Sequence, residues 1–278
     1  SGGLIIVSSG GDIENNYIID NGGNIEFKSG SIIGYSSETD VTINSGGILT
    51  IDNGAEQYQG AVYSLSGGTI VSYKAMGDTL NSWSDAGGTL ILNSGGTYNP
   101  SSNALVAGNN EIDINSGATA SSLYLLSGNK LVIGSNGSAA DVTINSGATA
   151  VFSAGAIEYA TLNGGVISAY NSPPYFTWGS SGGTLILESG VVDAGETTSA
   201  GNANIYVNSG AILQKTAILS GNTLEVKSGG VVSSFTISSD GGVGVQGFTS
   251  SATVSNGGVL EVASGGTIAN NTVESGGS

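Results

Sequence analysis

The sequence predicts an all-β fold, a right-handed parallel β-helix (solenoid) of about 14 coils with two side excursions. Three observations carry this prediction: short segments of alternating apolar residues, glycines at regular intervals, and no long segment with a 3.6-residue period. One series of the 48 glycines runs from Gly2 to Gly276 in fourteen intervals, which gives about 20 residues per coil.

Each expected strand alternates apolar and polar residues and ends in Ser-Gly or Asn-Gly. The unit stands at 24–30 (NIEFKSG), 89–95 (TLILNSG) and 223–229 (TLEVKSG). Alternation buries every second side chain, and glycine allows the positive φ of a sharp corner, so we interpret the glycine-rich strings as coil corners. One coil cannot bury its apolar side chains alone, but a stack of parallel coils can.

A longer repeat is also present, because residues 67–73 resemble residues 164–170. After each copy the alternation is lost, a tryptophan follows, and GGTLIL resumes at 87–92 and 182–187. The sequence therefore predicts one β-helix over 1–278, with excursions near 74–86 and 171–181.

Charge and composition exclude many functions. Twenty-one acidic residues face only five lysines, and arginine, histidine and cysteine are absent, which gives a net charge of −16. Nucleic acid and anionic membrane surfaces are therefore disfavoured as partners, and no apolar run approaches the ~20 residues of a membrane helix. Ser-His-Asp triads, Cys-His pairs and histidine-based zinc sites are impossible. We expect no enzyme activity, no cofactor and no metal.

Three weaker signals remain open. Residues 241–246 approach a calcium-binding nonapeptide but lack its final carboxylate. Glu111 with Asp113 offers a carboxylate pair for a polysaccharide hydrolase or lyase, although such pairs are more often solvated strand faces. Lys28 and Lys227 each follow a glutamate by two residues, which places both charges on one face as a surface ion pair.

Aromatic residues cluster in the expected excursions or at their mouths. Exposed rings stack on sugars or enter protein pockets, whereas buried rings would pack an excursion back onto the solenoid. Both interpretations stay open. The candidate ligand-binding residues are Tyr73, Trp83, Tyr170, Tyr175, Phe176 and Trp178.

The repeats carry a family resemblance. The Ser-Gly-Gly-x-Leu-x-Val-x-Ser-Gly-Gly pattern and the segment TINSGG at 42–47 resemble the passenger repeats of self-associating autotransporter adhesins. The resemblance covers essentially the whole chain. It implies a Gram-negative cell-surface adhesin, anchored in the outer membrane through a domain outside this sequence.

The same resemblance implies function and modification. Members of this family mediate cell–cell aggregation, biofilm formation or host attachment, so the expected partners are copies on neighbouring cells and host-surface glycans or proteins. The alternative functions are a binding rod that reads glycans or host proteins through its aromatic excursions and, less favoured, a polysaccharide lyase or hydrolase. Some members carry heptose on repeat serines; the corresponding candidates here are Ser29, Ser45, Ser94, Ser116 and Ser146.

Overall fold

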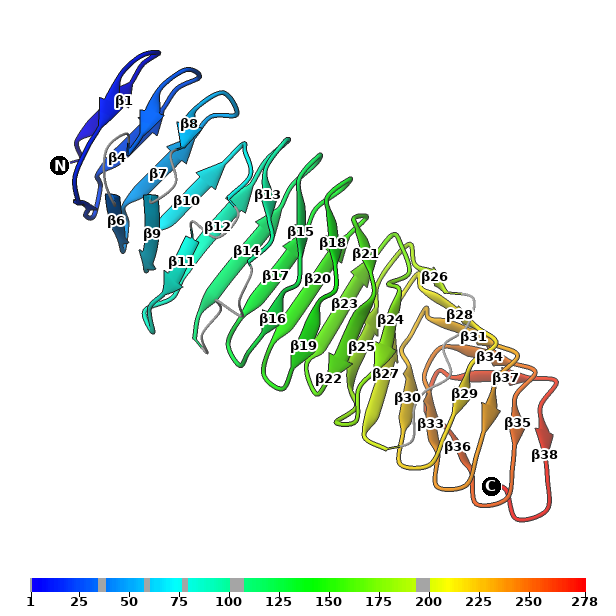
Figure 1. Cartoon of the computed structure of the whole chain (residues 1–278). Helices are drawn as coiled ribbons and strands as arrows, with labels where there is room; N and C mark the ends of the chain where they lie inside the picture. The colour runs from blue at the N-terminus through cyan, green and yellow to red at the C-terminus, as the bar shows by residue number, and fades with distance from the viewer. Residues whose placement is uncertain (1, 35–38, 58–60, 77–79, 101–107, 194–200) are drawn as a thin grey trace. The chain divides into compact units, whose positions relative to one another are not determined.

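A computed structural model describes residues 2–34, 39–57, 61–76, 80–100, 108–193 and 201–278. Within these ranges the chain is all-β without a helix, a parallel β-solenoid of about 13 turns (Figure 1). This confirms the predicted fold class. Contacts divide the chain into two compact units, Ser1–Thr143 and Ile144–Ser278, where the sequence predicts a single body.

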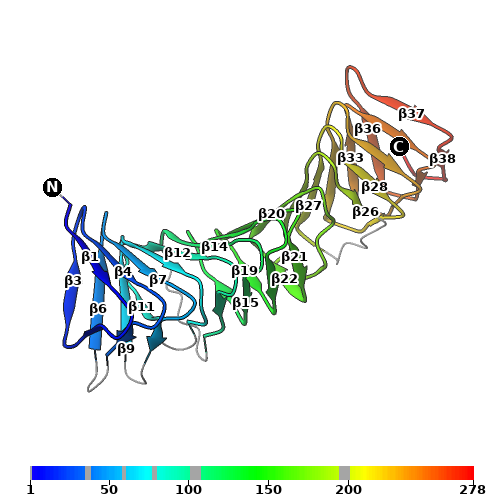
Figure 2. The ribbon, with the colours of Figure 1, turned by 90° about the horizontal axis from the view of Figure 1, so that it is seen from above.

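A typical coil contributes one short strand in turn to each of three faces, which we call the first, second and third faces (Figure 2). The first face has the longest strands. In the first unit it consists of β1 (Leu4–Val7), β4 (Asn24–Phe27), β7 (Ile48–Ile51), β10 (Thr69–Ser72), β12 (Gly88–Leu92), β14 (Asn110–Ile114) and β17 (Lys130–Ile133). In the second unit it consists of β20 (Thr149–Ser153), β23 (Val166–Tyr170), β25 (Gly183–Leu187), β27 (Ala203–Val207), β30 (Thr223–Val226), β33 (Gly242–Val245) and β36 (Val259–Val262).

The second face is built from shorter strands. In the first unit these are β2 (Asp12–Ile13), β5 (Ile32–Ile33), β8 (Glu56–Gln57), β13 (Thr97–Tyr98), β15 (Thr119–Ser121) and β18 (Ser138–Ala140). In the second unit they are β21 (Ala156–Glu158), β26 (Val192–Asp193), β28 (Ile212–Gln214), β31 (Val231–Ser233), β34 (Phe248–Ser250) and β37 (Thr267–Ala269).

The third face closes each coil. In the first unit it contains β3 (Tyr17–Ile19), β6 (Thr39–Asn44), β9 (Ala61–Ser66), β11 (Leu80–Trp83) and β16 (Tyr124–Leu125). The remaining strands of this face are β19 (Thr143–Asn145), which starts at the last residue of the first unit, β22 (Ala160–Asn163), β24 (Phe176–Trp178), β29 (Ala217–Ile218), β32 (Thr236–Ile237), β35 (Thr253–Val254) and β38 (Thr272–Val273).

Alternation along each strand produces columns of like side chains in the core. The strands of the first face pair in register, so every second residue points inward onto its equivalent in the next coil. One such column in the first unit is aliphatic throughout and fully buried from its second member: Ile25, Leu49, Ile70, Leu90, Ile112 and Leu131.

Glycine corners meet two steric demands at once. Gly30 has a φ of 75°, and a Cβ placed on it would lie 2.6 Å from the Ser9 Oγ of the preceding coil. Its backbone N–H donates to the Gly54 carbonyl at 2.7 Å, so the parallel hydrogen bonding continues around the corner. Glycine meets both demands with the least strain, although Asn136 and Asp240 take the same corner position with positive φ.

A different corner joins the second face to the third. Here a single non-glycine residue turns the chain with positive φ, as at Ser234 (58°), whose N–H donates to the Ser250 carbonyl at 3.0 Å. The residues at this corner are chemically mixed: Ser122 and Asp141 in the first unit, and Tyr159, Lys215, Ser234, Ser251 and Asn270 in the second.

The two expected excursions differ from the structure. An excursion would lengthen its coil, but Thr69 pairs in register with Thr89, and Val166 with Thr184 only 18 residues on. Both segments instead supply a strand of the third face, since β11 pairs with β9 and β24 with β22. In the second segment, Pro173 and Pro174 stand between β23 and β24, where other coils form a second-face strand; proline cannot donate to a strand ladder.

Candidate binding surfaces

The outward side chains of the first face form a mixed surface of hydroxyl, aliphatic and charged groups. In the first unit the outward row Thr69, Thr89, Glu111 and Lys130 stands in register across four strands. These residues alternate with buried residues along each strand. The packed core therefore fixes their places on the surface, and no binding partner is needed to hold them there.

Several charges on this face form local ion pairs. Glu26 lies 2.8 Å from Lys28 and Glu225 lies 3.2 Å from Lys227, which confirms the predicted surface ion pairs. Glu111 pairs with Lys130 of the next strand, and this hydrogen bond raises the pKa of the lysine. Burial raises the pKa of the neighbouring Asp113 carboxyl, Glu111 raises it further, and Lys130 opposes both effects. Glu111, the suggested catalytic carboxylate, is thus already held by a cation.

Rows of hydrogen-bonded amides border the first face on both sides. Asn115 donates to Asn93 at 2.9 Å just after the first-face strands, and Asn163 donates to Asn145 at 3.1 Å just before them. Asp20 with Asn44 and Glu188 with Asn208 extend the same pattern. We call these four pairs the amide rows.

The six predicted aromatic residues divide between core and surface. Trp83 is 3% exposed and Phe176 is 5% exposed, so both serve packing. Trp178 is half-buried and meets Phe176 edge to face at 5.1 Å. Tyr73, Tyr170 and Tyr175 are exposed.

An exposed tyrosine pair escaped the sequence analysis. Tyr159 and Tyr175 are 67% and 65% exposed, and their rings meet edge to face with centroids 6.0 Å apart. They meet because Ala160 pairs with Phe176, which places the preceding residues side by side on successive coils. This offset of 16 residues, shorter than the 20-residue period, was the signal that could have revealed the pair.

The five candidate serines all lie exposed in turns. Ser29, Ser94 and Ser116 follow first-face strands, whereas Ser45 and Ser146 follow third-face strands. Four of them, all except Ser116, lie against a glycine of the next coil: Gly54, Gly117, Gly67 and Gly164. The serine side chains occupy the space in which a Cβ on these glycines would lie, so glycine permits the close stacking of successive corners.

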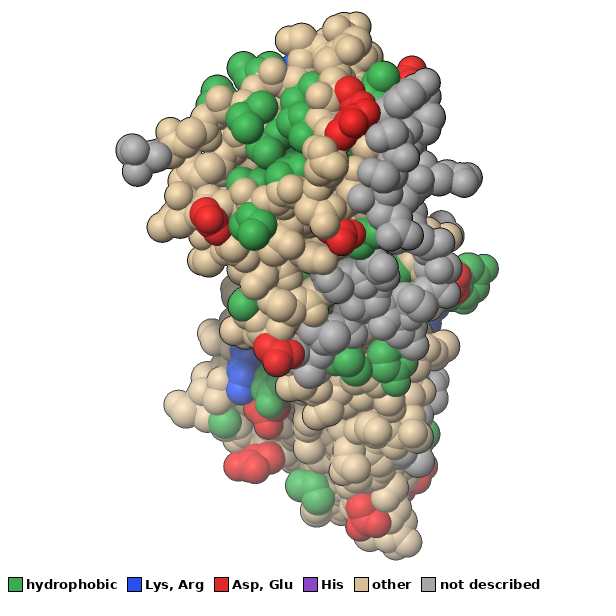
Figure 3. Space-filling model, turned by 60° about the vertical axis from the view of Figure 1, so that its left-hand side comes forward, with side chains coloured by type: hydrophobic (Ala, Val, Ile, Leu, Met, Phe, Trp, Pro, Cys, Tyr) green, Lys and Arg blue, Asp and Glu red, His purple; other side chains and the backbone are tan. Residues whose placement is uncertain are grey.

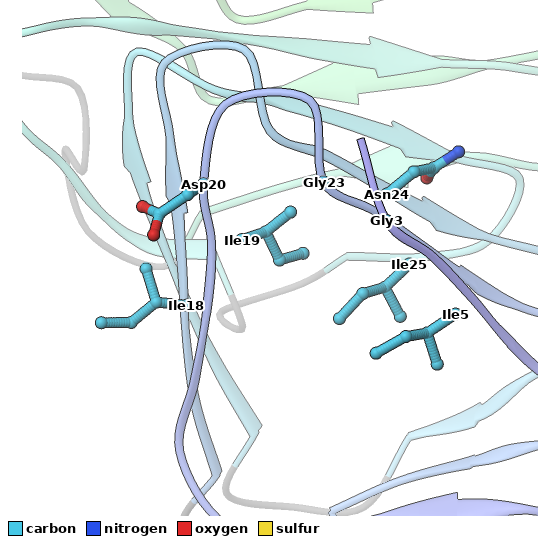
Figure 4. Close-up of a pocket in the computed structure, with 8 residues that line it drawn as sticks. All are labelled: Gly3, Ile5, Ile18, Ile19, Asp20, Gly23, Asn24 and Ile25. Carbon is cyan, nitrogen blue, oxygen red and sulfur yellow. The ribbon is translucent and has the colours of Figure 1, made fainter. Parts of the chain in front are cut away.

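The first coil leaves an apolar hollow of about 170 Å³ beside Ile5, Ile18 and Ile25 (Figure 4). Ile5 stands in register with Ile25, whose side chain is buried, so the hollow is the open end of a core column rather than a shaped site. Figure 3 brings this side forward and shows hydrophobic side chains near the top of a surface that otherwise carries scattered acidic and few basic groups.

Comparisons with known proteins give a match among solved structures. No family model and no curated protein sequence matches the chain. Among solved structures, the crystal structure of a TibA fragment hyper-glycosylated by TibC matches with a TM-score of 0.56 and 25% identity, covering 99% of this chain and 90% of the fragment.

The chain has the fold of an autotransporter adhesin passenger. This similarity supports an adhesin-like role and indicates a surface-exposed, extracellular location. Across the described ranges, no helix is both long and apolar enough to cross a membrane.

Replacement of Trp83 by alanine should destabilise the fold rather than remove a ligand contact. A buried tryptophan exchanged for alanine costs about 3–5 kcal/mol, whereas Tyr73→Ala, at an exposed ring, should change the unfolding free energy by less than about 1 kcal/mol. Denaturant unfolding followed by circular dichroism measures both. Equal stability of Trp83→Ala and wild type would contradict the buried position.

Proposed function

We propose that the protein is a non-catalytic bacterial cell-surface adhesin that mediates cell–cell aggregation, and through it biofilm formation, by contact with copies on neighbouring cells. The similarity to an adhesin passenger over 99% of the chain supports this proposal. The regular surface supports it as well, because polar side chains recur at equivalent positions in successive coils and hydrogen-bond to one another.

The amide rows are the elements best suited to such contacts. Each amide in a row is oriented by its neighbour in the next coil, so little side-chain entropy is lost when it binds. A single amide contact is weak, but repetition along two surfaces multiplies weak contacts into stable attachment. Both borders of the first face therefore offer adhesive edges.

Removal of the amide rows should slow aggregation. Cells that display Asn93→Ala with Asn115→Ala, or Asn145→Ala with Asn163→Ala, are expected to settle several-fold more slowly than wild type. Ser122→Ala with Ser234→Ala, on the corner away from the first face, is the matched control and should settle normally. Unchanged settling for both amide variants would remove these rows from the mechanism, and no settling by wild-type cells would remove self-association itself.

Host attachment through exposed aromatic rings is a second candidate function, favoured by the Tyr159–Tyr175 pair. Two exposed rings at right angles offer a face and an edge to a sugar ring or an apolar side chain. We expect Tyr159→Ala with Tyr175→Ala to reduce binding to host cells by about tenfold, given ~1 kcal/mol or more per exposed aromatic contact. Tyr124→Ala, another exposed tyrosine, is the control in the same flow-cytometric assay; equal loss in both variants would refute a specific site.

Sugar modification of the corner serines is proposed from their exposure and from the hyper-glycosylated state of the TibA fragment. Incubation of the protein with TibC and a sugar-nucleotide donor should add sugar at Ser29, Ser45, Ser94, Ser116 and Ser146, and each Ser→Ala variant should lose its own mass increment. Ser31 and Ser72 are buried and should stay unmodified. Intact-mass and peptide mass spectrometry give the answer, and modification of Ser31 or Ser72 would show that corner exposure does not select the sites.

A further inference from the structure

One strand of the first face lacks outward side chains. β33 reads Gly-Val-Gly-Val, so Val243 and Val245 point into the core while Gly242 and Gly244 stand at the outward positions. The adjacent strands carry Thr223 with Glu225 and Val259 with Glu261 at the equivalent positions.

The fold does not require these two glycines. Neither has a positive φ, and β33 pairs with both neighbouring strands in unbroken register, without a bulge. A Cβ on Gly242 would meet nothing within 4 Å, and the atoms nearest to a Cβ on Gly244 would be those of the flexible carboxylate of Glu225. Glycine weakens a strand interior, and it commonly marks a place where a ligand or another chain approaches the backbone closely.

The missing side chains leave a hollow in the surface. Two adjoining cavities of about 180 and 150 Å³ lie over β33 and share Glu225, Gly244 and Glu261 in their linings. We call this hollow the glycine trough. Its floor is the bare backbone of Gly242 and Gly244; Thr223 and Glu225 form one wall, and Val259 and Glu261 form the other.

The trough is acidic on both walls. The Glu225 carboxylate forms an ion pair with the Lys227 ammonium group at 3.2 Å. The same ammonium group lies 5.5 Å from the centre of the Tyr206 ring. Glu261 is exposed, and among the described residues no ion pair engages it. The two carboxylates stand two strands apart, about 10 Å between their backbones, so a cation between them would be attracted by both.

We propose that the glycine trough binds a lysine or arginine side chain on an extended segment of a basic partner protein. The aliphatic stem would lie on the glycine floor against Val259, and the cationic head would reach the carboxylates of Glu225 and Glu261. The net charge of −16 attracts a basic partner at long range, whereas a second copy of this chain offers only five lysines. This partner is therefore different from the copies proposed to mediate aggregation.

Other occupants fit the trough less well. A neutral sugar prefers an aromatic platform, and neither cavity is lined by an aromatic ring. A divalent cation needs several oxygen ligands within about 2.6 Å, and no group of three or more acidic side chains suited to a metal ion occurs in the described part of the chain.

The test measures binding of a fluorescent twelve-residue peptide of alternating lysine and serine to the full chain by anisotropy. Glu261→Gln should weaken binding about tenfold, as expected for loss of one charged hydrogen bond. Gly242→Thr with Gly244→Thr fills the trough with residues that favour strands and should abolish binding while the melting temperature stays equal or rises.

Two matched variants control for general effects. Glu274→Gln removes one exposed charge elsewhere in the same unit, and Ser168→Thr adds a methyl group to the same face; both should bind like wild type. Unchanged affinity of the filled variant, or an equal loss in Glu274→Gln, would overturn the proposal, the latter because diffuse attraction would then explain binding. Equal binding of a glutamine–serine peptide would also overturn it.

Discussion

The whole structure depends on backbone register between coils. A single coil exposes both edges of three short strands and cannot bury its apolar side chains, so each must return its backbone to the place where the previous coil offered hydrogen bonds. The first face shows how strictly this holds: strands from coils of different length still pair residue for residue, as Thr69 with Thr89 and Val166 with Thr184. Variation is therefore confined to corners, connections and outward side chains.

Alternation and glycine corners were enough to predict the solenoid and the composition of its core. The rule that residues i and i+2 share a strand face also placed the Glu26–Lys28 and Glu225–Lys227 pairs correctly. These features depend on local sequence alone. Side chains alternate between the two faces of a strand, so the direction of each one follows from its place in the strand and not from the neighbouring coils.

Features that depend on coil length were not predictable in the same way. The segments around Trp83 and Trp178 lose the alternation, and a loop that leaves the stack produces the same signal as a coil with one strand missing. The burial of Trp83 and the contact between Tyr159 and Tyr175 depend on the length of each coil. The repeat pattern does not determine that length for these two coils. The interpretation of glycine-rich strings as coil corners likewise fails at Gly242, which begins a strand and has no positive φ.

At the corner between the second and third faces, the backbone conformation does not depend on which side chain is present. Its positive φ is held by backbone hydrogen bonds between successive coils, such as that from Lys215 to the Ser233 carbonyl, and the side chains project from the surface. Serine, aspartate, tyrosine, lysine and asparagine all occupy this place. Within each unit, successive coils therefore place one exposed side chain at this corner about every 5 Å. Substitutions here can change the chemical groups on the surface without changing the backbone of the solenoid.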